Sequence, residues 1–383
     1  MKPRRLLTIG HSYAVTLNRR LADEMARVGQ GQWEVSAIAP KLLPGDLQPV
    51  AFEPNPDEVC STEGVNVRFA KRIHTMAYGL RVREILRNDW DLVHAWEEPY
   101  VLAGFQIAWW TPRRVPFVFW TAQNLSKKYP PPFRWFERFC LLRSAGWLAC
   151  GQTTLDAMKP RGYLTKPHRI LPLGVEIEKF HPDPAAGIAV RRRLGWTADG
   201  PPVVGYLGRF VSEKGVNVLQ QALDQTASSW RALFVGGGHL EPTLRTWSAS
   251  HGDRVRIVTG VPHNEVPQYL NAMDVLAAPS QTTPTWREQQ GRMLIEGFAS
   301  GCAVVGSDSG EIPFVIADAG IVVPEADVAA WATVLGELID NPARRVELGA
   351  RGRDRALRFY AWSEIAQQHL NFFDELVATS PRS

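Results

Sequence analysis

The sequence is poor in cysteine, and its few cysteines are not arranged to bind a metal. The four are Cys60, Cys140, Cys150 and Cys302, and no two form a C-x-x-C pair. Cys150 and Cys302 lie in or beside apolar runs, where a free thiol behaves as a small buried side chain. We therefore expect buried thiols rather than disulfides, as in a reducing cytoplasm.

Long uncharged apolar runs are also absent. A membrane-spanning helix needs about 20 apolar residues in succession, and the nearest candidate, Val101–Trp110, is too short. The opening residues, MKPRRLLTIG, have a basic start followed by only a short apolar run. We therefore expect a first β-strand there rather than a signal peptide.

The glycine-rich turn of dinucleotide-binding proteins is missing as well. Such a turn reads G-x-G-x-x-G after the first strand, whereas here Gly10 is followed by His11 and Ser12. This argues against an oxidoreductase with a nicotinamide cofactor, although doubly wound domains also bind dinucleotides. Oxidoreductase therefore stays a minor alternative, which a titration with nicotinamide cofactor would decide.

The composition is otherwise that of an ordinary globular protein with one basic segment. Hydrophobic residues make up 45% and charged residues 21% of the 383 residues, a length that favours two domains. Between Val101 and Ile170, eleven Lys or Arg residues are balanced only by Glu137 and Asp156. A basic surface of this kind suits phosphates, anionic lipid headgroups or nucleic acid, or is simply solvated.

Strands and helices alternate along the chain. Leu6–Gly10 and Trp33–Ala39 read as strands on either side of a helix at Leu17–Val28, which favours a parallel sheet. Residues 40–67 read as an irregular region with room for a small hairpin. The first domain then continues with strands expected at Trp90–Ala95, Pro116–Thr121, Gly146–Cys150 and Arg169–Pro172.

A second α/β domain follows a joint with several prolines at Gly174–Pro202. Glycines and small residues recur at the carboxyl ends of its expected strands, among them Gly208 and Gly237. Ligands of open α/β sheets bind at those ends, where glycine lets a ligand approach the backbone. The strands are expected at Val203–Leu207, Arg231–Val235, Val255–Val261, Val275–Pro279, Ala303–Ser307 and Ile321–Val323, and helices at Pro342–Phe359 and Trp362–Val377 end the chain.

The stretch Trp286–Gly301, WREQQGRMLIEGFASG, holds two acids, Glu288 and Glu296, with Gly291 between them. We expect a helix over Gln290–Ala299, whose first free N–H groups would attract an anion. An acid in a loop, a glycine at the helix start and a second acid in the helix predict a site for a nucleotide sugar. Taken alone, however, the two acids fit solvated surface positions equally well.

Several blocks of the second half, taken in order, resemble retaining glycosyltransferases of GT-B architecture, family 4. They are GYLGRFVSEKGVNVLQQAL, then LFVGGG, DVLAAPS and EQQGRMLIEGFASGCAVVGSDSGEIP. The likeness covers nearly the whole C-terminal half and, more loosely, the N-terminal half. It implies an α/β fold of two Rossmann-like doubly wound domains that face a cleft. Residues 1–175 would bind the acceptor and 176–360 the nucleotide sugar, and a final helix in 361–383 would cross back onto the first domain.

The resemblance also implies roles for individual residues. Arg209 and Lys214 match the family's G-R-x(4)-K block and would stabilise the departing diphosphate, without a metal or other cofactor. Glu288 matches the acid beside the transferred sugar, and Glu296 matches the acid that holds the donor ribose. The other donor contacts implied are Gly10, Gly208, Gly237, Val261, Pro262, Gln289, Gln290 and Gly291.

The acceptor side departs from the family's pattern. Many members have a histidine after the strand that corresponds to Pro116–Thr121, whereas this chain continues with alanine, Gln123 and Asn124. Gln123 or Asn124 could donate a hydrogen bond there but cannot act as an acid or base. His94 could contact the acceptor or be a structural histidine. Transfer with retention stays feasible, since in a front-face mechanism the leaving diphosphate itself helps to deprotonate the acceptor.

The resemblance implies a glycan or lipid-linked acceptor, as in glycan, glycolipid or exopolysaccharide synthesis. The segment Ser126–Arg143, SKKYPPPFRWFERFCLLR, mixes basic and aromatic residues and suits a membrane surface. Alternatively, Trp135, Phe139 and Leu142 simply face the core. We expect a cytoplasmic protein, with peripheral contact at the inner membrane face left open, and no nucleic-acid partner. A non-catalytic protein that binds nucleotide sugars is the main alternative function.

Overall fold

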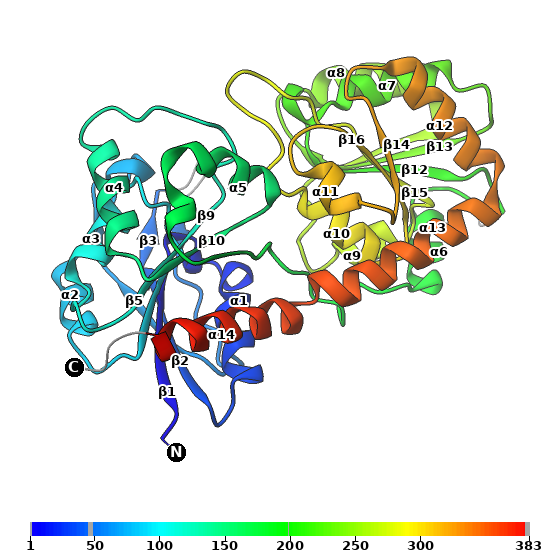
Figure 1. Cartoon of the computed structure of the whole chain (residues 1–383). Coiled ribbons are helices and arrows are strands. Elements are labelled where there is room, and N and C mark those ends of the chain that lie inside the picture. Colours follow the sequence, from blue (N-terminus) through cyan, green and yellow to red (C-terminus); the bar gives the residue numbers. More distant parts are fainter. Residues whose placement is uncertain (1, 45–48, 198, 380–383) are drawn as a thin grey trace. The chain divides into compact units, whose positions relative to one another are not determined.

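The computed structural model describes residues 2–44, 49–197 and 199–379 (Figure 1). By its internal contacts the chain divides into two units, which are described separately here. Unit 1 comprises Met1–Pro172 together with Trp362–Ser383, and unit 2 comprises Leu173–Ala361. The last four residues of the expected C-terminal segment, 380–383, lie outside the described residues.

Unit 1 is built on a parallel sheet that has seven strands within the described residues. From one edge to the other they are β11 (His168–Ile170), β10 (Gly146–Ala149), β9 (Phe117–Thr121), β8 (Leu92–Ala95), β1 (Arg4–Ile9), β2 (Trp33–Pro40) and β5 (Ser61–Val65). Each neighbouring pair runs parallel, so all the carboxyl ends meet at one edge. The helices are α1 (Thr16–Val28), α2 (Leu80–Leu86), α3 (Leu102–Trp110), α4 (Phe133–Arg143), α5 (Gln152–Met158) and α14 (Trp362–Thr379).

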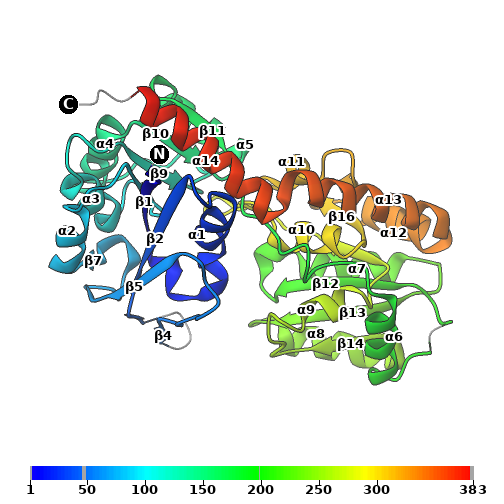
Figure 2. The ribbon, with the colours of Figure 1, turned by 90° about the horizontal axis from the view of Figure 1, so that it is seen from below.

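The strands of unit 1 bury both faces, as parallel strands between helices must. Leu7 and Ile9 of β1 pack into a core with residues of α2 and α3. Thr8, between them, points to the other face and bonds the buried ring of His94. There α14, the last helix of the chain, packs against α1 and beside the sheet (Figures 1 and 2). A segment distant in sequence thus completes the fold of unit 1.

The region 40–67 is more regular than its sequence suggests. The small hairpin is present, formed by β3 (Leu42–Leu43) and β4 (Val50–Ala51). The segment also supplies β5, an edge strand that pairs in parallel with β2, so a wholly irregular reading was wrong. Its sequence, STEGV, gives little strand signal because only Val65 is buried. A second short pair joins β6 (Val67–Arg68) to β7 (Ala77–Tyr78).

Unit 2 is a second α/β unit, with a parallel sheet of six strands in its described part. In order across the sheet they are β14 (Val255–Val258), β13 (Arg231–Gly237), β12 (Val203–Arg209), β15 (Val275–Ala278), β16 (Ala303–Ser307) and β17 (Ile321–Val323). The helices are α6 (Pro184–Arg193), α7 (Val216–Gln225), α8 (Glu241–Ser250), α9 (Val266–Leu270), α10 (Arg292–Ala299), α11 (Ile312–Ile316), α12 (Val328–Asp340) and α13 (Pro342–Arg355).

Alternate residues of the unit 2 strands enter two different cores. In β12, Val203 belongs to the cluster that contains α10, and Val204 to the cluster that contains α7 and α12. The period-two alternation of a strand produces this division. The sheet therefore lies between two helical layers, and its carboxyl edge is the place where side chains can meet a ligand.

Three expectations for unit 2 need correction. Residues 184–193, expected as part of an extended joint, form α6, which begins at Pro184 after Asp183 accepts a hydrogen bond from the Ala186 N–H at 3.0 Å. The helix expected from Gln290 begins only at Arg292. The helix expected to Phe359 is α-helical to Arg355 and continues as a π-helical turn over Ala356–Tyr360. Among the described residues, no helix has the length and apolar character needed to cross a membrane.

Candidate functional site

The sheet of unit 2 has its topological switch point between β12 and β15. The chain runs outward from β12 to β13 and β14, then returns to β15 on the other side. At such a point the connections leave in opposite directions, and ligands of doubly wound sheets bind beyond the carboxyl ends. Here the two strands end at Arg209 and Ala278, and the loops that follow carry Lys214 and Ser280.

Lys214 and Glu288 form an ion pair at this edge. The Lys214 Nζ donates to Glu288 Oε2, and the Ser280 hydroxyl donates to the same oxygen at 2.9 Å. The ammonium also lies 4.9 Å from the ring centroid of Trp286, a cation–π contact. Both partners are largely shielded, with 13% and 7% of their side chains exposed. The sequence placed both residues in the site but did not foresee that they pair with each other.

Gly215 lets the loop that carries Lys214 pack closely against the end of β15. This glycine has φ +69°, in the left-handed region that glycine favours. A Cβ there would lie 1.7 Å from the Pro279 carbonyl oxygen at the end of the neighbouring strand. Gly215 is also the residue from which α7 begins. Backbone geometry therefore fixes the distance between the Lys214 loop and the end of β15.

Glu296 forms a second polar group, with a partner that the sequence reading did not select. Its Oε1 lies 3.3 Å from His263 Nε2 and 3.8 Å from Arg292 Nε. Glu296 is 6% exposed in α10, whereas the His263 side chain is 33% exposed. His263 directly follows Val261 and Pro262 in the loop after β14. That adjacency was the available signal, since both neighbours were selected and the histidine was not.

Gln289, Gln290 and Gly291 differ in their surroundings. Gln289 is exposed, whereas Gly291 is buried with φ +73° at the start of α10. The Gln290 side chain accepts from the Leu173 N–H at 2.7 Å and donates to the Leu173 carbonyl at 2.8 Å. Gln290 therefore ties the loop to the first residue of unit 2, a role the sequence did not suggest. Of the three, Gly291 is the residue that directly precedes α10.

Arg209, Gly208 and Gly237 lie where β12 and β13 end. Arg209 pairs with Gly237 in the register of the two strands. Its side chain is 64% exposed, with one guanidinium nitrogen 3.7 Å from Glu213 Oε1. A Cβ on Gly237 would meet no atom within 4 Å, so the backbone there is open. Unlike Lys214, Arg209 is a solvated cation at the edge of the site.

The four candidates in unit 1 do not share one environment. Gly10 follows β1, and Gln123 and Asn124 follow β9, all at the carboxyl edge of the sheet. Gln123 donates from Nε2 to the Tyr129 hydroxyl at 3.0 Å. His94 is fully buried, and its ring packs against Phe373 of α14. Burial, together with a neighbouring histidine, lowers the pKa of His94 well below its ordinary value, so the geometry favours the structural alternative.

A polar cluster at the same edge escaped the sequence reading. Glu97 accepts from the His11 backbone N–H at 2.7 Å, from His11 Nδ1 at 2.6 Å and from the Tyr78 hydroxyl at 2.7 Å. Next to it, Glu98 accepts from the Thr121 hydroxyl at 2.5 Å and from a backbone N–H at 2.9 Å. Burial raises the pKa of Glu98 to about 7. The signal available was position, since His11 follows β1 and the two acids follow β8.

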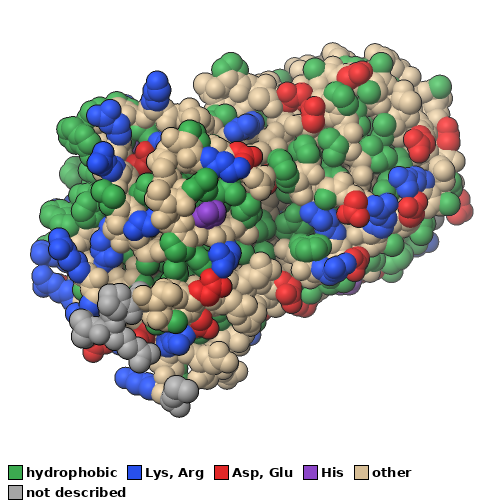
Figure 3. Space-filling model, viewed as in Figure 1, with side chains coloured by type: hydrophobic (Ala, Val, Ile, Leu, Met, Phe, Trp, Pro, Cys, Tyr) green, Lys and Arg blue, Asp and Glu red, His purple; other side chains and the backbone are tan. Residues whose placement is uncertain are grey.

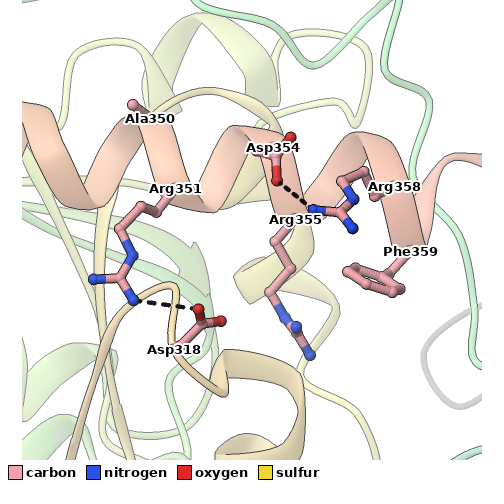
Figure 4. Close-up of a pocket in the computed structure, with 7 residues that line it drawn as sticks. All are labelled: Asp318, Ala350, Arg351, Asp354, Arg355, Arg358 and Phe359. Carbon is pink, nitrogen blue, oxygen red and sulfur yellow. Dashed lines mark hydrogen bonds and ion pairs between the residues drawn. The ribbon is translucent and has the colours of Figure 1, made fainter.

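A depression of about 400 Å³ elsewhere in unit 2 is lined by none of the candidate residues (Figure 4). Its arginines already have partners: Arg351 lies 3.3 Å from Asp318, and Arg358 lies 3.3 Å from Asp354. Arg355 donates to the Val315 carbonyl at 2.7 Å. This depression therefore does not coincide with the candidate site. It is lined by Asp318, Ala350, Arg351, Asp354, Arg355, Arg358 and Phe359.

Solved structures with the same arrangement define the class of protein. Sucrose-phosphate synthase from Thermosynechococcus elongatus matches with a TM-score of 0.74 at 21% identity, over 98% of this chain and 100% of that chain. HepE from Anabaena, in complex with UDP, matches with a TM-score of 0.74 at 17% identity, over 97% and 100% of the two chains. The chain therefore has the GT-B fold, in which both domains are Rossmann-like.

Sequence comparisons give the family. The model described as Glycosyltransferase Family 4 matches residues 14–179, and the model described as Glycosyl transferases group 1 matches residues 201–341. The chain belongs to glycosyltransferase family 4, as its second half already indicated.

All four cysteines are free and buried, as expected.

Two curated relatives illustrate the family. One is the GDP-mannose-dependent monoacylated alpha-(1-6)-phosphatidylinositol monomannoside mannosyltransferase of Corynebacterium glutamicum, 31% identical over 208 residues, or 52% of this chain and 54% of that protein. The other is the D-inositol 3-phosphate glycosyltransferase of Xylanimonas cellulosilytica, 32% identical over 224 residues, or 55% and 52%. The chain spans about half the length of the curated relatives it matches.

Proposed function

We propose that the protein is a retaining glycosyltransferase, which moves a sugar from a nucleotide diphosphate sugar to an acceptor hydroxyl without a metal ion. The observation that carries the proposal is the shielded Lys214–Glu288 pair at the switch point of unit 2, in a chain of this family. Membership of the family favours transfer over simple binding. The names of its relatives, which act on inositol phosphates and lipid-linked mannosides, favour a glycan or glycolipid acceptor.

In this proposal unit 2 holds the donor through groups of complementary chemistry. Lys214 meets the diphosphate as a point charge, and exposed Arg209 adds a planar guanidinium that can bind two oxygens. Glu296, held by His263, accepts the hydroxyls of the ribose, since an ionised carboxylate only accepts hydrogen bonds. Glu288 accepts hydroxyls of the transferred sugar.

The chemical step relies on position and charge rather than on a protein acid. As the bond from the sugar to the diphosphate breaks, negative charge grows on the leaving oxygen. Lys214 is already oriented by Glu288 and Trp286, so it stabilises that charge without reorganising. The leaving oxygen takes the proton of the acceptor hydroxyl, which attacks from the same face and so retains the configuration.

Turnover by single variants tests this function. Wild type, Lys214→Ala and Glu296→Ala are incubated with UDP-glucose or GDP-mannose in the presence of methyl α-mannoside or D-inositol 3-phosphate as acceptor, and the released nucleoside diphosphate is measured. We expect release by the wild type from one donor and at least a hundredfold loss in both variants, with unfolding monitored in parallel. Near-normal turnover in both folded variants would refute the proposed function. Donor binding without any turnover would favour the non-catalytic binding protein instead.

A surface of unit 1 suits contact with an anionic membrane, which we also propose. Trp109 of α3 and Trp135 and Leu142 of α4 are 63%, 59% and 65% exposed, so the last two do not face the core. Lys and Arg side chains of α4 and of the segment just before it are exposed as well. Figure 3 shows hydrophobic and basic side chains together on this face. The positive charges are Lys127, Lys128, Arg134 and Arg138.

Sedimentation with vesicles tests the contact. Each Lys or Arg near an anionic surface contributes about 1 kcal/mol, so we expect binding to vesicles of phosphatidylcholine with phosphatidylserine but not to phosphatidylcholine alone. The variant Trp135→Ser should weaken this binding severalfold. Val346→Ser, which changes a 73% exposed residue of unit 2, should not. Equal loss in the two variants, or binding that ignores phosphatidylserine, would rule the surface out.

A further inference from the structure

The sheet of unit 1 has a switch point of its own, between β1 and β8. The chain leaves β1 toward β2 and β5 on one side and then returns to β8 on the other. By the same rule as in unit 2, the carboxyl ends of β1 and β8 are the expected place for a ligand. The residues that follow these ends include His11, Glu97 and Glu98.

Glu97 is a buried acceptor of hydrogen bonds from His11 and Tyr78. It is 1% exposed, and its two oxygens receive the His11 N–H, His11 Nδ1 and the hydroxyl of Tyr78. The His11 side chain is 32% exposed. A carboxylate accepts but cannot donate, so the proton of a neutral His11 resides on Nδ1. The ring therefore has Nε2, with its lone pair, to offer to a ligand.

The electrostatic surroundings of this ring favour its protonated form more than water does. Burial disfavours the imidazolium, but the carboxylates of Glu97 and Glu98 outweigh burial, so the pKa of His11 is raised above its ordinary value. Glu98 is half-buried and bonded to Thr121 at the end of β9, which makes it a second oxygen acceptor at the same edge. An imidazole nitrogen and a carboxylate at the same sheet edge can both accept from hydroxyls of a sugar or cyclitol.

We propose that His11, positioned by Glu97 and Tyr78, binds a hydroxyl of a polyol acceptor at this edge, with Glu98 accepting a neighbouring hydroxyl. The inference rests on the proposed function and deepens it, because it names residues of unit 1 that would contact the acceptor. The acceptor hydroxyl donates to Nε2 of neutral His11. The ring orients the hydroxyl, and the proton still leaves with the diphosphate.

Nuclear magnetic resonance of the His11 ring tests the site independently of turnover. The His11 signal is identified by its loss in His11→Gln and is followed while myo-inositol, D-inositol 3-phosphate and methyl α-mannoside are added. We expect a saturable shift with at least one compound. We also expect the pKa of His11 to fall on binding, because the neutral ring is the form that accepts the hydroxyl.

A matched pair of variants separates positioning from general damage to the fold. Glu97→Gln can donate to Nδ1 and so moves the ring proton to Nε2, which should weaken polyol binding at least tenfold. Glu137→Gln changes another buried glutamate of unit 1 that accepts from a tyrosine, Tyr163, at 2.8 Å, and should leave polyol binding unchanged.

The outcomes distinguish this site from the proposed function. If none of the polyols shifts the His11 signal while nucleotides still bind through Lys214, the acceptor site is wrong and the donor assignment stands. Equal polyol affinity in Glu97→Gln and wild type would also overturn it. If polyols bind at His11 but no nucleotide binds the protein, the acceptor site stands and the proposed transfer fails.

Discussion

Loss of the Lys214 ammonium should cost unit 2 much of its stability. In Lys214→Ala, the buried Glu288 carboxylate loses its ion pair with the ammonium and keeps the hydrogen bond from Ser280. Removing one partner of a buried ion pair typically costs about 3–5 kcal/mol. Because Ser280 remains, we expect the lower end, about 3 kcal/mol. For a unit of this size each kcal/mol shifts the melting temperature by about 2–4 °C, so the transition should fall by about 6–12 °C.

The double variant Lys214→Met with Glu288→Gln shows whether the pair itself is responsible. Replacing both ions removes the two buried charges together, and the new amide can still accept from Ser280, so most of the stability should return. Urea unfolding of Lys214→Met, of Glu288→Gln and of the double variant gives the coupling free energy. The control Arg358→Ala removes an exposed ion pair of unit 2 and should change little. Additive single changes, or a Lys214→Ala protein as stable as wild type, would refute the buried-pair reasoning.

Three further predictions follow from other parts of the structure. Glu296→Ala should abolish the preference for a ribonucleoside diphosphate over its 2′-deoxy analogue, measured by calorimetry, whereas an unchanged preference would exclude Glu296 as the ribose contact. Burial lowers the pKa of His369 from 6.5 to about 4. The unfolded chain therefore binds the proton more readily than the folded protein, and stability is lost as the pH falls from about 6.5 to about 4. Urea unfolding should show a loss of free energy of unfolding on the order of 3 kcal/mol over this pH range, and a smaller loss in His369→Leu. The same loss in the variant would contradict the role of His369. Gly215→Ala should destabilise unit 2 by well over 1 kcal/mol, and more than Gly260→Ala, which has φ +70° but open space around it; equal losses would contradict the close packing.

The sequence was informative where chemistry is local. The strand β12 could be predicted from its apolar run and glycine-rich end, and α10 from the apolar spacing after Gly291. Its exact start was missed because Gln290, a good helix former, is held outside the helix by its bonds to Leu173. Family motifs selected Lys214, which follows β12, and Glu296, which lies in α10; their roles stay predictions.

Long-range contacts were beyond the sequence. Lys214 and Glu288 are 74 residues apart, and no local pattern shows that they neutralise each other. His94 was ambiguous because the helix that buries it, α14, comes from the other end of the chain. His11 was overlooked because its partner Glu97 follows a different strand. The first and the third depend on which strands are neighbours in the sheet, and the second depends on where the last helix packs.

We propose above that Lys214 of unit 2 holds the diphosphate of the donor. Calorimetric titration with UDP and UMP, and with GDP and GMP, tests it directly. For one base we predict that wild type binds the diphosphate at least tenfold more tightly than the monophosphate, about 1.4 kcal/mol. Lys214→Ala should lower this ratio severalfold, because only the exposed Arg209 then remains to meet the diphosphate. Absence of nucleotide binding in wild type, or the same ratio in the variant, would contradict the claim.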